Sequence, residues 1–330
     1  MYNFCTLFDS NYLSRGLAMY QSLSRHCKDF HLYVFTFDNK TFEVLRKFNL
    51  LNTTIISLDQ FEDKELLKVK KERSRVEYLW TCSSSIILYV LKNYKVNSCT
   101  YLDADIYFFE SPKVLIDEAK ENSVIITKHR FSPRYKSSVK YGIYCVQFAF
   151  FRNNKQGIKV LKWWRNACID WCYIKKKSGK FGDQKYLDDW PERFKGIHVL
   201  QHLGGGLASW NVQQYDFYIR DTQLFGREKK TKKEFEVISY HFHGLKFLNN
   251  NKVDLGGYEI SENVINTFYK PYLGHLEKIK RDILSVDSSF DPHGTVRIKK
   301  DLKTMLKFIK RRINGVKSNY NIYSISSLRE

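Results

Sequence analysis

The chain has 330 residues, 43% of them hydrophobic and 16% aromatic, so it can bury a large core and is not an intrinsically disordered polymer. Its formal net charge of +20 favours anionic partners, such as a nucleotide, a nucleic acid or an acidic membrane surface. The seven cysteines form no Cys-x-x-Cys pair, and no apolar run approaches the roughly 18 residues of a membrane-spanning helix. We therefore expect a globular protein of the cytoplasm with reduced, buried thiols and no secretory signal.

The first half of the chain alternates strand and helix patterns. Short apolar runs predict strands, and apolar residues at helical spacing predict helices. We expect strands over 4–8, 30–37, 53–58, 99–102, 124–127 and 146–151, with helices over 13–26, 42–48, 78–94 and 156–173. This alternation indicates an α/β fold with a mostly parallel sheet and helices on both faces.

The most informative segment is the run from Cys99 to Phe109, in which two carboxylates, Asp103 and Asp105, interrupt an apolar sequence. Buried carboxylates are costly unless they are paired, and two that point together repel, so a divalent cation is their natural partner. The carboxyl end of a strand is also where an open α/β sheet places its ligand site. We predict a metal site here, although a strand-end carboxylate can instead cap a helix.

Two later segments carry further candidates. Three consecutive glycines at 204–206 permit a close backbone approach to a ligand, or simply a flexible loop, and do not match a dinucleotide fingerprint. A strand predicted over 237–245 carries His241 and His243 near its end, and we expect these two side chains to face opposite sides of the strand.

The segment 297–317 differs from the rest of the chain. It combines one apolar helical stripe with nine Lys or Arg and one Asp, which predicts a basic amphipathic helix. Such a helix can bind an anionic membrane surface, which would place the protein in the cytoplasm, peripheral at the inner face of the membrane. The alternative is a helix packed on the domain with a solvated basic face. We expect one domain over 1–254 and a C-terminal helical basic region over 255–330.

Six separated motifs, in order over roughly residues 2–250, resemble those of the retaining GT-A glycosyltransferases of glycosyltransferase family eight. They are Asp9-Ser10-Asn11-Tyr12, Asp103-x-Asp105, the stretch 142–153, Asp183-Gln184, Trp210-Asn211 and the run from His241 to Lys246. Any one of them is a weak signal, whereas six in register are specific. Two other stretches, RFSPRY and GDQKYLDDWPERF, resemble bacterial sugar transferases of surface-polysaccharide gene clusters.

The resemblance implies a GT-A fold, a Rossmann-like nucleotide-diphospho-sugar transferase. It implies a metal-dependent, retaining transfer of sugar from a nucleoside-diphospho sugar, UDP-linked, to a glycan or lipid-linked saccharide acceptor in lipopolysaccharide or capsule synthesis. By this resemblance, Asp103, Asp105 and His241 would bind Mn²⁺ or Mg²⁺, and Asp9, Asn11 and Tyr12 would bind the nucleobase. Gly244 and Lys246 would bind the diphosphate. Asp183 would bind the donor sugar, and Gln184 would stabilise the oxocarbenium.

The chain also departs from the family. Cys145-Val146-Gln147 replaces the family's Asn-Ala-Gly, and Lys246 comes one residue early. The arginine that the family carries on the helix before Asp-x-Asp is absent, and Arg73 or Arg75 could compensate. The donor sugar, or the way it is held, could therefore differ.

Several alternatives stay open at this point. His243 competes with His241 as the metal ligand, Asp9 and Asn11 fit ordinary turn chemistry, and Asp183 fits a helix N-cap. An inverting GT-A transferase would need a carboxylate base, for which Asp188 or Asp189 could serve. A nucleic-acid-binding protein would explain the charge, but the basic residues gather in the tail and no nucleic-acid-binding motif is visible, so no specific nucleic acid is expected.

Overall fold

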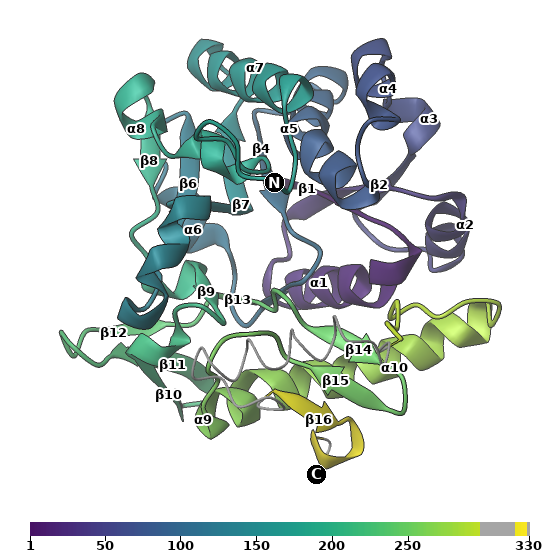
Figure 1. The fold of residues 1–330 in the computed structure, drawn as a ribbon, viewed down its shortest axis with the longest axis vertical. Coiled ribbons are helices and arrows are strands. Elements are labelled where there is room, and N and C mark those ends of the chain that lie inside the picture. The colour runs from purple at the N-terminus through teal and green to yellow at the C-terminus, as the bar shows by residue number, and fades with distance from the viewer. Residues whose placement is uncertain (298–320, 329–330) are drawn as a thin grey trace.

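Seven strands form the central sheet of the computed structural model, which describes residues 1–297 and 321–328 (Figure 1). Their order across the sheet is β3-β2-β1-β4-β7-β6-β8. The strands are β1 (Tyr2–Phe8), β2 (Phe30–Thr36), β3 (Thr53–Ser57), β4 (Ser98–Leu102), β6 (Val124–Lys128), β7 (Tyr144–Arg152) and β8 (Ile197–Val199). Only β7 runs antiparallel to its neighbours, so the predicted mostly parallel sheet is confirmed.

Helices cover both faces of this sheet, as predicted. The residues of β1 show why: Phe4 and Phe8 belong to the hydrophobic cluster that includes helix α1 (Leu13–His26), whereas Cys5 and Leu7 belong to the cluster on the other face. That second cluster includes α5 (Arg75–Asn93) and α7 (Lys155–Asp170). The shorter helices are α2 (Asn39–Lys47), α3 (Leu58–Phe61), α4 (Lys64–Lys70), α6 (Lys113–Asp117) and α8 (Trp190–Arg193).

Most helix ends follow from local signals. Helix α1 covers the predicted range, and α5 starts three residues before its predicted start because Ser74 and Glu77 form a capping box. Helix α7 ends at Asp170, since Trp171 adopts an extended conformation, so the predicted end at residue 173 was late. All seven cysteines are free and buried, which confirms the prediction of reduced core thiols.

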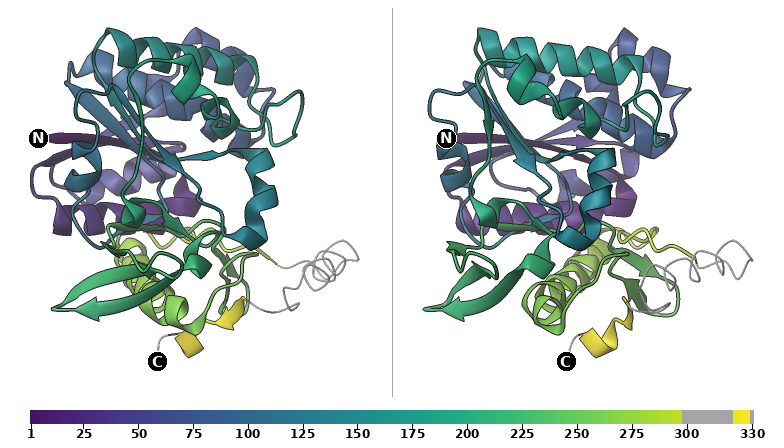
Figure 2. Two further views of the ribbon diagram at one scale, coloured as in Figure 1. Left: turned by 90° about the vertical axis from the view of Figure 1, so that its left-hand side faces the viewer. Right: turned by 60° about the vertical axis from the view of Figure 1, so that its left-hand side comes forward.

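A second layer lies below α1 in Figure 1 and is seen from the side in Figure 2. At the upper edge of this layer, beside α1, a small sheet joins β5 (Ile106–Phe108), β13 (Ser239–His241) and β9 (Leu207–Ala208). In this sheet His241 pairs with Ile106, which places the histidine beside the two carboxylates that precede β5. The strand predicted over 237–245 is shorter than expected, because the chain turns at Gly244, whose φ is +80°.

The remaining elements of this layer are two antiparallel sheets and a long helix. The sheets are β10 (Tyr215–Arg220), β11 (Gln223–Glu228) and β12 (Glu234–Glu236), and β14 (Lys246–Leu248), β15 (Lys252–Asp254) and β16 (Ile322–Ser324). Helices α9 (Glu262–Val264) and α10 (Lys270–Val286) flank the short π-helix Ile265–Tyr269, and α10 packs on α1 within the same hydrophobic cluster.

The C-terminal predictions remain open. The basic helix predicted over 297–317 lies outside the described residues but for its first position, and the boundary predicted after residue 254 stays a prediction. Within residues 1–297 and 321–328, no helix combines the length and the apolar character needed to cross a bilayer.

Candidate active site

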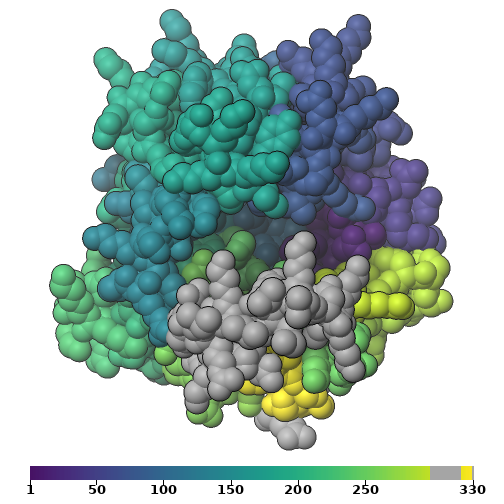
Figure 3. All heavy atoms as spheres, in the orientation of Figure 1, coloured from purple at the N-terminus to yellow at the C-terminus, as the bar shows by residue number. Residues whose placement is uncertain are grey.

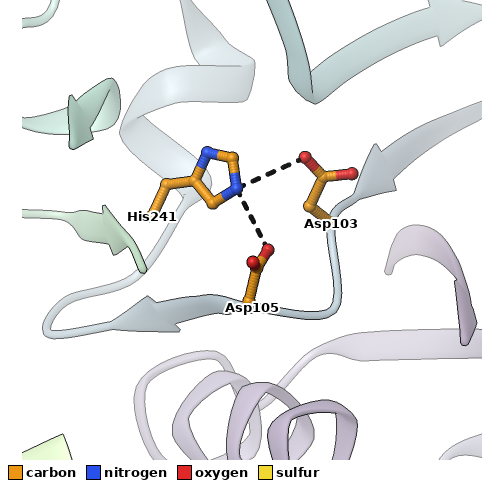
Figure 4. Close-up of side chains that lie close together, drawn as sticks. All are labelled: Asp103, Asp105 and His241. Carbon is orange, nitrogen blue, oxygen red and sulfur yellow. Dashed lines mark ion pairs between the residues drawn. The ribbon is translucent and has the colours of Figure 1, made fainter. Parts of the chain in front are cut away.

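The two carboxylates of the Asp-x-Asp segment lie at the carboxyl end of β4, where the chain passes into β5. The Asp103 amide donates to the carbonyl of Gln147 on β7 at 3.0 Å, which fixes the start of this turn. Nε2 of His241 lies 3.0 Å from Oδ1 of Asp105 and 3.6 Å from Oδ2 of Asp103 (Figure 4). The structure thus brings the three predicted metal ligands together.

The charges of this cluster depend on one another. Burial raises the pKa of Asp103, and the charge of Asp105 raises it further. Burial acts in the same direction on Asp105, but the positive charge of His241 and its hydrogen bond lower the pKa of Asp105 to about 2. Burial would lower the pKa of His241, yet the same two carboxylates raise it well above its usual range. The cluster therefore favours a positive charge at its centre.

The donor set fits a divalent cation. One ligand atom from each of the three residues lies within 4.8 Å of the others, as coordination of a single ion requires. Carboxylate oxygens and one imidazole suit Mn²⁺ and, less well, Mg²⁺. Within the described part of the chain, the buried Nδ1 of His241 has no hydrogen-bond partner, and the ring lies against the thiol of Cys145.

His243 lies on the same side as His241, not on the opposite side. The expectation was wrong because residues two apart along an extended chain share a face. The two rings are 5.5 Å apart, and each makes an edge contact with the ring of Trp210. Burial and the charge of His241 lower the pKa of His243 to about 4, so this imidazole is neutral at pH 7.

The turn after β1, residues 9–12, lies next to the metal cluster. Asp9 accepts a hydrogen bond from the Asn11 amide at 2.9 Å, which confirms the turn chemistry expected of this sequence. Tyr12 is 40% exposed; its partial burial raises its pKa, and the charge of the neighbouring Asp105 raises it further. The role of Asp9, Asn11 and Tyr12 in binding a nucleobase stays a prediction.

The two arginines expected to compensate for the missing family arginine have different surroundings. Arg75 bridges two strand-end carboxylates, with Nε 2.5 Å from Asp9 and Nη2 2.8 Å from Asp38. Arg73 is buried, donates to the carbonyl of Ile169 at 3.0 Å and stacks on the ring of Tyr173. Of the two, Arg75 is therefore the one beside the turn at residues 9–12.

A cleft with a volume of about 320 Å³ opens beside the metal cluster. Figure 3 shows a hollow in this face of the molecule, below the blue and teal upper part. Asp103, His241, Asp183 and Gln184 all line the cleft. The structure thus places the predicted catalytic pair in the same cavity as two of the predicted metal ligands.

Asp183 and Gln184 are held in defined orientations. Asp183 is buried, and its carboxylate makes no N-cap hydrogen bond, so the helix-cap interpretation is not supported. Burial, together with the charge of Asp103, raises the pKa of Asp183 to about 7. The side-chain nitrogen of Gln184 donates to the carbonyl of Tyr141 at 3.1 Å, which fixes the amide and leaves its oxygen as the available acceptor.

The other candidates from the sequence have three kinds of surroundings. Gly244 and Lys246 lie in the segment that follows His241 and are not among the described residues lining the cleft. Trp210 lines the cleft, but Asn211 is buried and hydrogen-bonds to backbone groups. Gly204 and Gly205 are packing positions, since a Cβ on Gly204 would lie 1.9 Å from the carbonyl oxygen of Glu236. The glycine run therefore serves close packing.

The carboxylates proposed as an inverting base are engaged elsewhere. Asp188 accepts from the Ile143 amide at 2.6 Å and pairs with Lys185 at 2.5 Å, and Asp189 pairs with Arg193. Neither belongs to the described residues that line the cleft.

Two features of the site escaped the sequence analysis. Aromatic side chains form much of the cleft wall, among them Trp80, Tyr141 and Phe181, and no local pattern distinguishes them from core aromatics. Arg15 is the other feature: it is 3% exposed, in the first turn of α1. The sequence signal for Arg15 is its position in the first turn of a predicted apolar helix. A cation is unfavourable at a helix N-terminus, so a basic residue there indicates a specific contact.

Sequence comparison relates the chain to two proteins of Bacillus subtilis. No family model matches the chain. It is 31% identical over 295 residues to the uncharacterized protein YfnD of Bacillus subtilis (strain 168), an alignment that covers 88% of this chain and 92% of YfnD. The uncharacterized protein YfnF of the same organism is 26% identical over 258 residues, which are 76% of this chain and 84% of YfnF.

Among solved structures, the galactosyltransferase LgtC, determined in complex with donor and acceptor sugar analogs, superposes with a TM-score of 0.51. The superposition covers 84% of this chain and 95% of LgtC at 11% sequence identity. At that identity the likeness concerns the fold, and the chain has the GT-A fold that the sequence motifs predicted.

Proposed function

The chain belongs to the same family as the uncharacterized protein YfnD of Bacillus subtilis, and from its fold and its site we propose that it is a metal-dependent glycosyltransferase. It transfers a sugar from a nucleoside-diphospho sugar, UDP-linked, to a glycan or lipid-linked saccharide. The observation that carries the proposal is the cluster of Asp103, Asp105 and His241 at the carboxyl end of β4, on the wall of a cleft that also holds Asp183 and Gln184.

In this proposal the three clustered side chains hold Mn²⁺ or Mg²⁺, which when bound offsets the negative charge that develops on the leaving diphosphate. The residues 9–12 bind the nucleobase, and Gly244 and Lys246 bind the diphosphate. Arg75 orients Asp9 through the ion pair at 2.5 Å, so it supports the nucleotide turn.

Asp183 and Gln184 act on the donor sugar. The buried carboxylate of Asp183 accepts hydrogen bonds from sugar hydroxyls, and its ordered position limits how the ring can lie. The Gln184 oxygen, held by the hydrogen bond from its amide nitrogen to Tyr141, stabilises positive charge on the anomeric carbon as the glycosidic bond breaks.

We propose retention of configuration. In a retaining reaction the acceptor attacks from the face that the leaving group vacates, and the leaving phosphate can accept the acceptor's proton, so no strong side-chain base is needed. The engagement of Asp188 and Asp189 outside the cleft supports this choice over inversion.

The acceptor belongs to bacterial surface-polysaccharide synthesis in our proposal, either lipopolysaccharide or capsule. Support comes from the RFSPRY and GDQKYLDDWPERF stretches and from the basic segment 297–317, which would hold the enzyme at the anionic inner face of the membrane.

The direct test is donor hydrolysis measured across a panel of sugar nucleotides, with Mn²⁺, with Mg²⁺ and with a chelator. We expect turnover of at least one sugar nucleotide that requires the divalent ion. The anomeric proton coupling of a transfer product then reports retention or inversion. Absence of both nucleotide binding and turnover with every donor and metal would contradict the proposed function.

A further inference from the structure

A buried arginine joins three segments around the proposed donor site. Arg15 lies in the first turn of α1 and is 3% exposed. Its guanidinium donates to the backbone carbonyls of Asn11 at 3.3 Å, His293 at 3.0 Å and Leu245 at 3.3 Å. One planar group with fixed donor directions therefore sets the distances between three parts of the chain that are far apart in sequence.

Each of these three segments lies at the donor site or supports it. Asn11 belongs to the nucleotide turn, and Leu245 stands between Gly244 and Lys246, the residues proposed to bind the diphosphate. The third segment, residues 291–296, packs directly on the turn: a Cβ on Gly294 would lie 2.6 Å from Cβ of Asn11. The Ser14 amide also donates to the carbonyl of Pro292 at 3.2 Å.

Ion pairing does not explain where this arginine lies. Within the described part of the chain, no carboxylate is within 4.0 Å of the guanidinium, and the start of a helix disfavours a cation. The group instead stacks on the ring of Tyr12, 4.4 Å from its centroid, and on the more distant ring of Phe247. Its contacts are thus with backbone carbonyls and with the rings of Tyr12 and Phe247.

We propose that Arg15 is a positioning residue that sets the nucleotide turn at a fixed distance from the diphosphate-binding segment. This inference rests on the proposed function. A donor that spans both segments gains affinity only if the distance between them is fixed, because the second contact is then made within an already bound molecule. A ligand that touches only one of the two segments gains no affinity from the fixed distance between them.

Two substitutions separate geometry from charge. Arg15→Lys keeps the charge but loses the planar fork, and Arg15→Met removes both while keeping an unbranched chain. Arg165→Lys is the matched control, because Arg165 is similarly buried and makes three side-chain hydrogen bonds, to Ser85, Glu65 and Asp63 in the helix layer away from the cleft.

The experiment measures the dissociation constants of UDP, CDP, GDP and ADP with Mn²⁺ by calorimetry, at a temperature where each variant is folded. For the nucleotide that the wild type binds, both Arg15 variants should bind the diphosphate about tenfold to a hundredfold more weakly. The corresponding monophosphate and inorganic diphosphate should each change by about threefold or less. Arg165→Lys should lower the melting temperature without changing any dissociation constant.

Hydrogen exchange on the wild type provides a test that does not depend on the folding of the variants. Binding of the nucleoside diphosphate should protect amides in residues 11–15, 244–246 and 291–296 together. Absence of protection in the last two segments would overturn the proposal. So would unchanged diphosphate affinity in folded Arg15 variants, full rescue by lysine, or an equal loss for the monophosphate. A wild type that binds none of the four diphosphates contradicts the proposed function instead.

Discussion

The two sides of the cleft are built from different chemistry. The charged side holds Asp103 and Asp105, in the turn between β4 and β5, and His241, the last residue of β13, whose polar atoms lie within a few ångströms of one another. The aromatic side holds Trp80, Tyr141 and Phe181 near Asp183 and Gln184, and it is shaped by the contacts of Phe181 with Trp80 of α5 and with Tyr141. In the proposed function, the charged side would hold the leaving group, whereas the aromatic side would orient the sugars.

Substitution of the carboxylates on the charged side should have the largest effect on sugar transfer. Asp103→Asn and Asp105→Asn should each lower metal-dependent transfer on the order of a thousandfold, because the ion that stabilises the leaving diphosphate is lost. Activity assays with added Mn²⁺ and titration of Mn²⁺ binding check this prediction. Either variant with full activity in chelator-treated buffer would remove the metal from the mechanism.

The same two variants should differ in the stability of the metal-free protein. The pKa of Asp105 is lowered to about 2, so its charge stabilises the fold above the pKa of the unfolded chain, and Asp105→Asn should cost about 2 kcal/mol at pH 7. The pKa of Asp103 is raised, so Asp103→Asn relieves repulsion and should not destabilise the fold. Urea unfolding of both variants in chelator gives the comparison.

On the aromatic side the largest effect should come from Gln184. Gln184→Ala should lower kcat about a hundredfold with little change in the donor KM, since the amide oxygen acts on charge that develops only in the transition state. Steady-state kinetics with varied donor would show this split. A parallel rise in KM with unchanged kcat would mean that Gln184 only binds the donor.

Asp183 should make stability depend on pH in the opposite sense to Asp105. Its folded pKa is about 7, above the unfolded value of 3.8, so the native state binds the extra proton and stability is lost as pH rises between them. The loss between pH 5 and pH 7.5 should be about 2 kcal/mol for the metal-free wild type and absent in Asp183→Asn. Unfolding at several pH values tests it, and equal slopes for both proteins would contradict the assignment.

The smallest effect should come from the aromatic wall itself. Phe181→Leu should raise the acceptor KM about tenfold or less while donor hydrolysis stays unchanged, because an aromatic face contributes a modest contact to a sugar ring. Phe225→Leu, on β11 away from the cleft, is the control. A loss of donor hydrolysis in Phe181→Leu would contradict this prediction and place the ring on the donor sugar instead of the acceptor.

The sequence could predict features that depend on neighbouring residues, but not contacts between distant parts of the chain. The range of α1 and the Asp-x-Asp turn depend on neighbouring residues, so the local pattern was sufficient. The sides taken by His241 and His243 were misjudged, and β13 ends earlier than predicted because the chain turns at Gly244. The contact between Arg15 and His293 could not be predicted, since it joins parts of the chain that meet only in the folded protein.

The pairing of β5 with β13 has a consequence for synthesis of the protein on the ribosome. The two carboxylates emerge early, at the end of β4, but the imidazole that completes their cluster arrives with β13, after the whole seven-stranded sheet has been translated. Closing so long a loop is slow compared with local folding. A nascent chain therefore presents an incomplete ligand set to the metal ions of the cell, and tight metal capture must wait until the sheet that positions it has formed.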